Sequence, residues 1–321
     1  MKKRNNKVIV LIVVAVLFAV SLLIFILNYS KDNSSFSILE KKWINDNTSN
    51  VLDISVYNDV PVYGKSGKGV IFDLLDDFTT TYGINFNKIS YSVDSSSNLN
   101  KNAFRVLNNN ESLTNKDILL YEDNYVLVST EEEVINNIND IDNHTVAVLK
   151  KDLNTVSNDL SEVKKISYLQ KENVNELEEA LKNKETNYVI VPYNMYMDFI
   201  LKNDLHILYH LSDISKKYVL TIENKTFLDI MKKYYLGYQK NKQQTSYKTN
   251  FLSEFFYDKE ITEADRMSYN SSSYNVGYIT YMPFTGKEEK DLVGTLSNYL
   301  SGFEDLFDVD LKVKYYNNIE E

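Results

Sequence analysis

LDISV, residues 52–56, alternates apolar and polar side chains and opens the stretch that decides the fold. An alternation with a period of two predicts a half-buried strand. After a glycine-rich loop at 64–69, apolar residues between 71 and 78 recur at helical spacing, and Gly83 stands where it can cap the end of a helix. Residues 86–91 predict a second strand, so the stretch forms a β-α-β unit.

The middle of the chain repeats this alternation of strand and helix. The apolar run 188–191 is stopped by Pro192, as expected for a buried parallel strand. Asn175 and Glu178 have the spacing of a capping box at a helix start. Further strands are predicted at 125–129, 145–149, 206–211 and 217–222, and further helices after Asp152 and from Phe227. The pattern predicts an α/β fold with parallel sheets.

Residues 8–27 form a continuous apolar run without a charged side chain, directly after a basic N-terminus. About 20 apolar residues are needed to cross a bilayer core, whereas a cleaved signal peptide has an apolar region of about 7–15 residues. We therefore expect an uncleaved transmembrane anchor over 8–29, between a cytoplasmic tail of residues 1–7 and a linker of residues 30–50. Because basic residues stay in the cytoplasm, the main domain is expected outside it.

Composition narrows the possible functions. The formal net charge of −10 argues against binding to nucleic acid. The absence of cysteine excludes a disulfide, a cysteine nucleophile and a lipid-modified cysteine. His206 and His210 have the spacing of metal ligands on a helix, but their segment alternates like a strand, so no metal site is predicted. Since no catalytic or cofactor-binding motif is present, we expect neither an enzyme nor a bound cofactor.

The C-terminal part echoes the first β-α-β unit. Residues 60–64 correspond to 282–286, and residues 85–91 correspond to 309–315, with an apolar helix pattern between the two matches. An internal repeat indicates that the same structural unit occurs more than once in a chain. We expect a complete domain over 51–260, a linker over 261–275 and the start of a second, incomplete copy over 276–321.

Five segments occur in an order and spacing that resemble the extracellular solute-binding proteins of family 3. They are Ile54–Tyr63, Phe72 with Asp73, Tyr121–Val128, Thr145–Lys150 and Tyr188–Pro192. The resemblance implies the type II periplasmic-binding-protein fold, in which two lobes close around a small solute. One β/α series interrupted by a second, with crossings near Ser129 and Leu211, predicts one lobe over 51–128 and 212–260 and a second over 130–210. A separate parallel sheet is expected in each lobe.

The sequence departs from this family at both residues that hold an amino acid. The position of the usual arginine falls near Lys116, and Arg105 stands too early in the chain. A lysine offers only a point charge where a guanidinium would grip a carboxylate with two hydrogen bonds. Pro192 replaces the usual acidic residue. We expect weak or absent binding of free amino acids and a solute recognised more by stacking than by charge.

The candidate ligand-binding residues are those expected at strand or helix ends facing the cleft, where parallel α/β sheets bind ligands. They are Tyr63, Thr114, Lys116, Tyr121, Lys151, Asp152 and Tyr193.

Together these features predict a membrane-anchored extracytoplasmic module that binds a small solute and signals across the membrane. Its other partner would be a downstream signalling domain or a permease. Two alternatives remain open. The chain is the solute-binding component of an ABC importer, or it is the input region of a cyclic-dinucleotide signalling enzyme whose catalytic part lies elsewhere.

Overall fold

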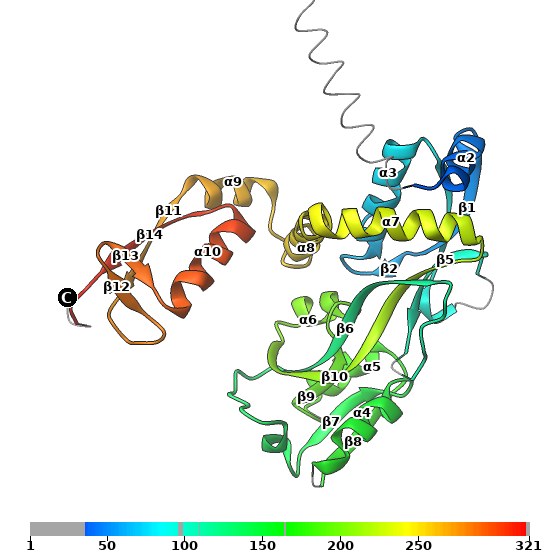
Figure 1. Cartoon of the computed structure of the whole chain (residues 1–321). Coiled ribbons are helices and arrows are strands. Elements are labelled where there is room, and N and C mark those ends of the chain that lie inside the picture. The colour runs from blue at the N-terminus through cyan, green and yellow to red at the C-terminus, as the bar shows by residue number, and fades with distance from the viewer. Residues whose placement is uncertain (1–35, 96–98, 109, 164, 319–321) are drawn as a thin grey trace, which may run out of the picture.

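The computed structural model describes residues 36–95, 99–108, 110–163 and 165–318. The expected anchor over 8–29 lies outside these ranges, and no helix within them is long and apolar enough to cross a membrane. Figure 1 shows two lobes connected by a pair of long strands, and a smaller C-terminal unit set apart from both.

The order of elements follows the predicted alternation. The helices are α2 (Ile38–Asn47), α3 (Val70–Tyr82), α4 (Leu153–Asp159), α5 (Val174–Lys182), α6 (Met197–Lys202), α7 (Lys225–Asn241), α8 (Gln243–Asp258), α9 (Glu263–Ser271) and α10 (Thr295–Phe307). The strands are β1 (Val51–Tyr57), β2 (Asp59–Val60), β3 (Gly64–Lys65), β4 (Asn85–Tyr91), β5 (Asn102–Leu107), β6 (Asp117–Ser129), β7 (Thr145–Leu149), β8 (Ser167–Lys171), β9 (Tyr188–Pro192), β10 (His206–Ile222), β11 (Ser273–Tyr278), β12 (Gly286–Glu288), β13 (Asp291–Val293) and β14 (Asp310–Tyr315).

One mixed sheet runs through both lobes, in the order β4-β1-β5-β10-β6-β9-β7-β8. Lobe 1 contains the parallel strands β4, β1 and β5, and lobe 2 contains the parallel strands β9, β7 and β8. The long antiparallel strands β6 and β10 pass from one lobe to the other. The expectation of a separate sheet in each lobe is therefore wrong, because hydrogen bonding continues through the shared strands. The two-lobed α/β fold itself is present.

The crossing point between the lobes is marked by a register shift. Leu211 pairs with Tyr125, but the next pair along β10 is Ser215 with Asn124. Residues 206–211 and 217–222, predicted as two strands, thus form one strand that is locally irregular. Irregularities of this kind bend a strand and interrupt its hydrogen bonding. We take this position as the hinge.

Apolar spacing explains the elements around the hinge. In β7, Val146 and Val148 pack into the core on one face of lobe 2, while Ala147 and Leu149 join the main core on the other. Both faces of this strand are covered, as in other buried parallel strands. At α5 the cap is Asn173, whose side chain accepts a hydrogen bond from the Glu176 amide. The predicted start at Asn175 is two residues late, because the same spacing fits the earlier pair.

The C-terminal unit has the element order of the first part of lobe 1. Strands β11 and β14 are parallel, as are β1 and β4, and the hairpin β12–β13 and helix α10 lie between them as β2–β3 and α3 do. Helix α3 begins after Gly69 (φ +120°) and α10 after Gly294 (φ +100°). The shared backbone geometry follows the sequence echo between the two segments.

Candidate functional site

A cavity of about 340 Å³ lies between the two lobes. Its walls come from the ends of β4 and β5 and the segments that follow them in lobe 1, from the loops before α4 and after β9 in lobe 2, and from the hinge strand β10. The lining residues are Tyr91, Val93, Asp94, Leu99, Arg105, Val106, Asn108, Glu111, Lys151, Met195 and Lys216. The carboxyl ends of parallel strands in open α/β sheets are the usual place for a ligand.

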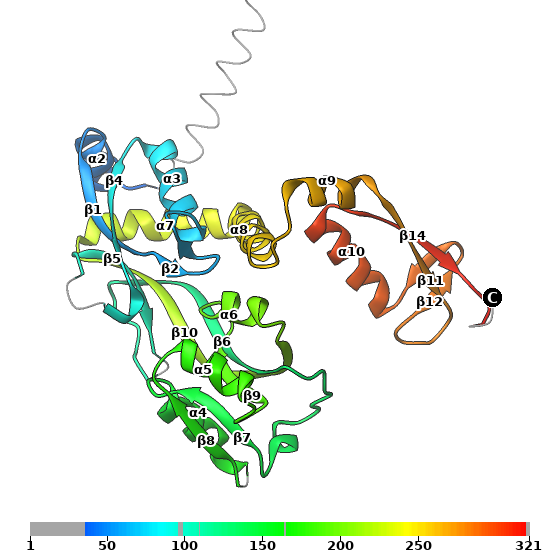
Figure 2. The same ribbon diagram turned by 180° about the vertical axis from the view of Figure 1, so that it is seen from behind.

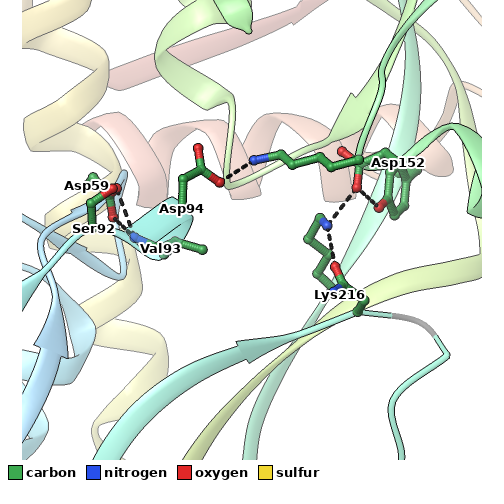
Figure 3. Close-up of polar contacts among 9 residues, drawn as sticks. Asp59, Ser92, Val93, Asp94, Asp152 and Lys216 are labelled. Carbon is green, nitrogen blue, oxygen red and sulfur yellow. Dashed lines mark hydrogen bonds and ion pairs between the residues drawn. The ribbon is translucent and has the colours of Figure 1, made fainter. Parts of the chain in front are cut away.

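A buried ion pair lies beside the cavity at the hinge (Figure 3). The Lys216 ammonium donates to Asp152 at 2.7 Å and to the Asn108 side chain at 2.9 Å. The Tyr125 hydroxyl donates to the same Asp152 oxygen at 2.9 Å. The second carboxylate oxygen of Asp152 is buried and has no hydrogen-bond partner among the described residues. The network joins a loop of lobe 1, the hinge strand and the start of α4 in lobe 2.

A second ion pair connects the lobes directly. The Lys151 ammonium lies 2.6 Å from the Asp94 carboxylate, which belongs to a short turn of lobe 1 (Figure 3). Asp59 holds this turn through hydrogen bonds from the Ser92 hydroxyl and the Val93 amide. Burial acts to lower the pKa of Lys151, but the Tyr196 hydroxyl and the Asp94 carboxylate outweigh it and hold that pKa above its usual value.

The tyrosines near the hinge stack on one another. The Tyr63 ring stacks on Tyr121 at 4.9 Å and on Tyr218 at 5.0 Å between centroids, and Tyr247 approaches it at 6.0 Å. Only 2% of Tyr63 is exposed. Because neighbouring rings cover it, the expected stacking of a solute on Tyr63 does not fit this packing.

Below these rings, the buried carboxylate of Asp123 fixes the turn after β9. It accepts hydrogen bonds from the Asn194 and Met195 amides at 2.8 and 3.0 Å and from the Tyr218 hydroxyl at 3.0 Å. Burial raises the pKa of Asp123 above its usual value, although these donors oppose the shift. The turn carries Met195 to the cavity wall, so Asp123 positions part of the site.

The structure separates the candidate residues into three groups. Lys151 lines the cavity, and Asp152 lies next to it in the buried ion pair. Tyr63 and Tyr121 meet in the tyrosine stack, and Tyr193 is half-buried against the main core nearby.

Thr114 and Lys116, in contrast, do not line the cavity. Thr114 donates to Asp117, and the Lys116 ammonium donates to Glu223 on the surface at 2.8 Å. Both residues precede β6 at its end in lobe 1, and Lys116 is eight residues from the hinge pair of Asn124, or roughly 26 Å along a strand. Thr114 and Lys116 therefore do not take the position in the cleft that the sequence predicted, because they lie at the end of lobe 1 away from the hinge.

Of the polar residues in the wall, the sequence predicted only Lys151 as a site residue, and Tyr91, Asp94, Arg105, Asn108, Glu111 and Lys216 were missed. Arg105, which stands outside the expected motif position, lines the cavity from β5, and Asn108 and Lys216 line it beside the hinge. No sequence signal marked Lys216, which is flanked by Ser215 and Lys217 and lies between the two predicted strands. Its burial, 3% exposed, is what shows that it needs a partner.

The two-lobed α/β fold resembles that of solved structures of periplasmic domains. No protein-family model and no curated protein matches the chain. The structure is similar to the periplasmic domain of BvgS from Bordetella pertussis, with a TM-score of 0.51 and 13% identity over 89% of this chain. This chain spans 60% of the length of that structure.

Two further structures resemble parts of the chain. A double mutant of the VFT2 domain of Bordetella pertussis BvgS has a TM-score of 0.50 and 14% identity, and the match covers 66% of this chain and 97% of that domain. AbpA from Streptococcus pneumoniae, an amino acid ABC transporter substrate-binding protein bound to L-arginine, has a TM-score of 0.48 and 16% identity, with 67% of this chain and 99% of AbpA covered.

Proposed function

We propose that this chain is a membrane-anchored, extracytoplasmic module that binds a small polar solute between its lobes and passes lobe closure to another domain. The observation that carries the proposal is the cavity of about 340 Å³ with walls from both lobes and the hinge. Its volume falls within the range of about 300–1,000 Å³ typical of small-molecule sites. A solute that touches both lobes stabilises the closed arrangement over an open one.

The charges of the cavity wall indicate the chemistry of the solute. Arg105, Lys151 and Lys216 contribute positive charge, while Asp94 and Glu111 contribute negative charge. Burying an apolar solute against these groups leaves their hydrogen-bonding capacity unfilled, which costs free energy. A solute with both acceptor and donor groups fits the wall better, and charge rather than stacking dominates its recognition.

Signalling is favoured over import by what surrounds the two lobes. The expected anchor precedes them, and the C-terminal unit repeats the element order of lobe 1. The match to the BvgS periplasmic domain covers 89% of the chain, more than the two lobes occupy, which supports a tandem arrangement. In this proposal the lobes keep their expected bounds, 51–128 with 212–260 and 130–210, and residues 276–321 begin a second domain of the same kind.

A comparison of two lysine variants tests the solute site. Amino acids, peptides and sugars are first screened for those that raise the melting temperature of the chain, and binding is then measured by titration calorimetry. Lys151→Met should weaken binding about tenfold or more, since hydrogen bonds to charged groups are worth about 1.5–3 kcal/mol. Lys116→Met is the matched control, because Lys116 also has one carboxylate partner but lies away from the cavity. Weakening by Lys116→Met with no effect of Lys151→Met would contradict the proposed site.

A further inference from the structure

Helix α8 contacts lobe 1 through one stripe of polar side chains. The Ser246 hydroxyl and the Asn250 amide donate to the Asp73 carboxylate at 2.6 and 2.8 Å. One turn further, Glu254 accepts a hydrogen bond from Lys65 at 2.7 Å. Positions four residues apart share one face of a helix, so this stripe binds α3 and the β2–β3 hairpin together.

The same helix contacts lobe 2. The Tyr247 hydroxyl donates to the Asn194 side chain at 3.0 Å, in the turn after β9. Directly after α8, the Lys259 ammonium donates to the carbonyl of Leu201 at 2.6 Å, in α6. Both contacts are made to lobe 2, across the cleft from the residues that the polar stripe binds in lobe 1.

Lys65 lies where lobe 1, helix α8 and lobe 2 meet. Its ammonium comes from lobe 1 and lies 2.7 Å from Glu254 of α8 and 3.5 Å from Asp198 of α6 in lobe 2. Only about a fifth of the Lys65 side chain is accessible, 22%. Partial burial weakens solvent screening, so each of the two ion pairs is stronger than a fully exposed one.

The far side of α8 holds the C-terminal unit. The rings of Phe255 and Phe256 lie 5.6 and 6.5 Å from that of Phe307, between centroids, and Lys248 lies 3.3 Å from Asp305. Figures 1 and 2 show from opposite sides that α8 follows α7 and stands between the lobes and the C-terminal unit. Helix α8, which belongs to lobe 1 by its residue range, thus contacts the rest of lobe 1, lobe 2 and the C-terminal unit.

We propose that α8 is a latch that holds the two lobes together and couples their separation to the position of the C-terminal unit. The proposal deepens the proposed function and rests on it, since separating the lobes opens the solute cavity. Because α7 continues into α8 and both pack on lobe 1, opening breaks the contacts of Tyr247 with Asn194, Lys65 with Asp198 and Lys259 with Leu201. The Lys151–Asp94 ion pair in the cleft breaks with them.

Electron–electron distance measurements on the chain of residues 1–321 test the latch. The chain has no cysteine, so spin labels attach only where cysteines are introduced. Thr80→Cys in α3 with Glu179→Cys in α5 reports lobe separation, and Thr80→Cys with Ser301→Cys in α10 reports the C-terminal unit. All three sites are exposed. The distances are compared between the parent chain and Lys65→Met/Tyr247→Phe, with no solute added.

In the latch variant we expect a longer distance between the lobes that the parent lacks, together with a changed distribution between α3 and α10. Lys225→Met/Tyr299→Phe, at exposed positions, should leave both unchanged. An unchanged interlobe distance overturns the latch, and a longer interlobe distance without change at α10 overturns the coupling. If Lys65→Met/Tyr247→Phe loses its far-ultraviolet dichroism, Lys259→Met provides the same comparison through the contacts of Lys259 with Leu201 and Asp204. Since no solute is present, a failure of solute binding leaves this readout intact.

Discussion

Lys216 and Asp152 form a buried pair whose members are held mainly by each other. Their side chains are 4% and 2% exposed. Removing one partner of such a pair leaves an uncompensated charge in the interior, whereas removing both often costs little. Stability at the hinge should therefore depend on the pair as a unit.

Lys216→Met should lower the free energy of unfolding by about 3–5 kcal/mol, because Asp152 then stays buried with only the Tyr125 hydroxyl as partner. Lys216→Met/Asp152→Leu should recover most of that loss. Lys182→Met, which breaks an exposed pair with Glu178, should cost no more than about 0.5 kcal/mol. Urea unfolding followed by tyrosine fluorescence measures all three. A double variant as unstable as the single one would show that packing, not charge, decides the result.

The same residues show why the site was only partly predictable. Lys216 contacts Asp152 across 64 positions and Asn108 across 108 positions of sequence. No local spacing encodes a contact of that kind. Lys151 was predictable because it follows a recognisable buried strand, where an α/β fold places its loops at the cleft. The cleft position expected for Lys116 was taken from the motif of the solute-binding family. In the structure Lys116 lies just before β6, at the end of that strand away from the hinge.

At the scale of elements, the start of α3 depends on a glycine without a side chain. A Cβ at Gly69 would lie 2.6 Å from the carbonyl carbon and oxygen of Tyr63 and 2.8 Å from the amide nitrogen of Gly64. Its φ of +120° is also unfavourable for other residues. The backbone at the start of α3 therefore lies so close to residues 63 and 64 that only glycine fits at position 69.

Gly69→Ala should destabilise the chain by about 2 kcal/mol or more, because both backbone strain and overlap oppose it. Gly237→Ala is the matched control, since Gly237 is exposed within α7 and a Cβ there meets nothing within 4 Å. It should stabilise by about 0.5–1 kcal/mol through helix propensity. Guanidinium unfolding compares them. Equal effects of the two substitutions would contradict the role given to Gly69.

Elements with strong local patterns were predictable, and those set by tertiary pairing were not. The helix α3 and its αL cap at Gly83 follow from apolar spacing and a glycine. In contrast, β6 extends from Asp117 to Ser129, and only its apolar second half was expected as a strand. The first half becomes a strand because β10 pairs with it along Asp117–Tyr121. Pairing of this kind overrides local preference.

For the whole molecule, the narrow attachment of the C-terminal unit suggests that the lobes fold without it. A variant ending at Ser271 loses the ring contacts of Phe307 and the ion pair of Asp305 with Lys248. An aromatic pair contributes about 0.5–1.5 kcal/mol and an exposed ion pair up to about 1 kcal/mol. We expect the cooperative unfolding transition to remain, with a melting temperature lower by several degrees. Calorimetry with far-ultraviolet dichroism measures this, and loss of the transition would show that the lobes need the unit.

The connection of the lobes also decides how the chain carries mechanical tension. It enters lobe 1 through α2, where Trp43 stacks on Phe227 of α7 at 5.0 Å, and it leaves toward the C-terminal unit through α7 and α8. Lobe 2 is inserted between the two hinge strands, so both of its connections return to lobe 1. A pull between the two ends of the described chain is therefore borne along the backbone by lobe 1 and α8, while lobe 2 stays outside the covalent line of force and meets it only through its non-covalent contacts with α8 and lobe 1.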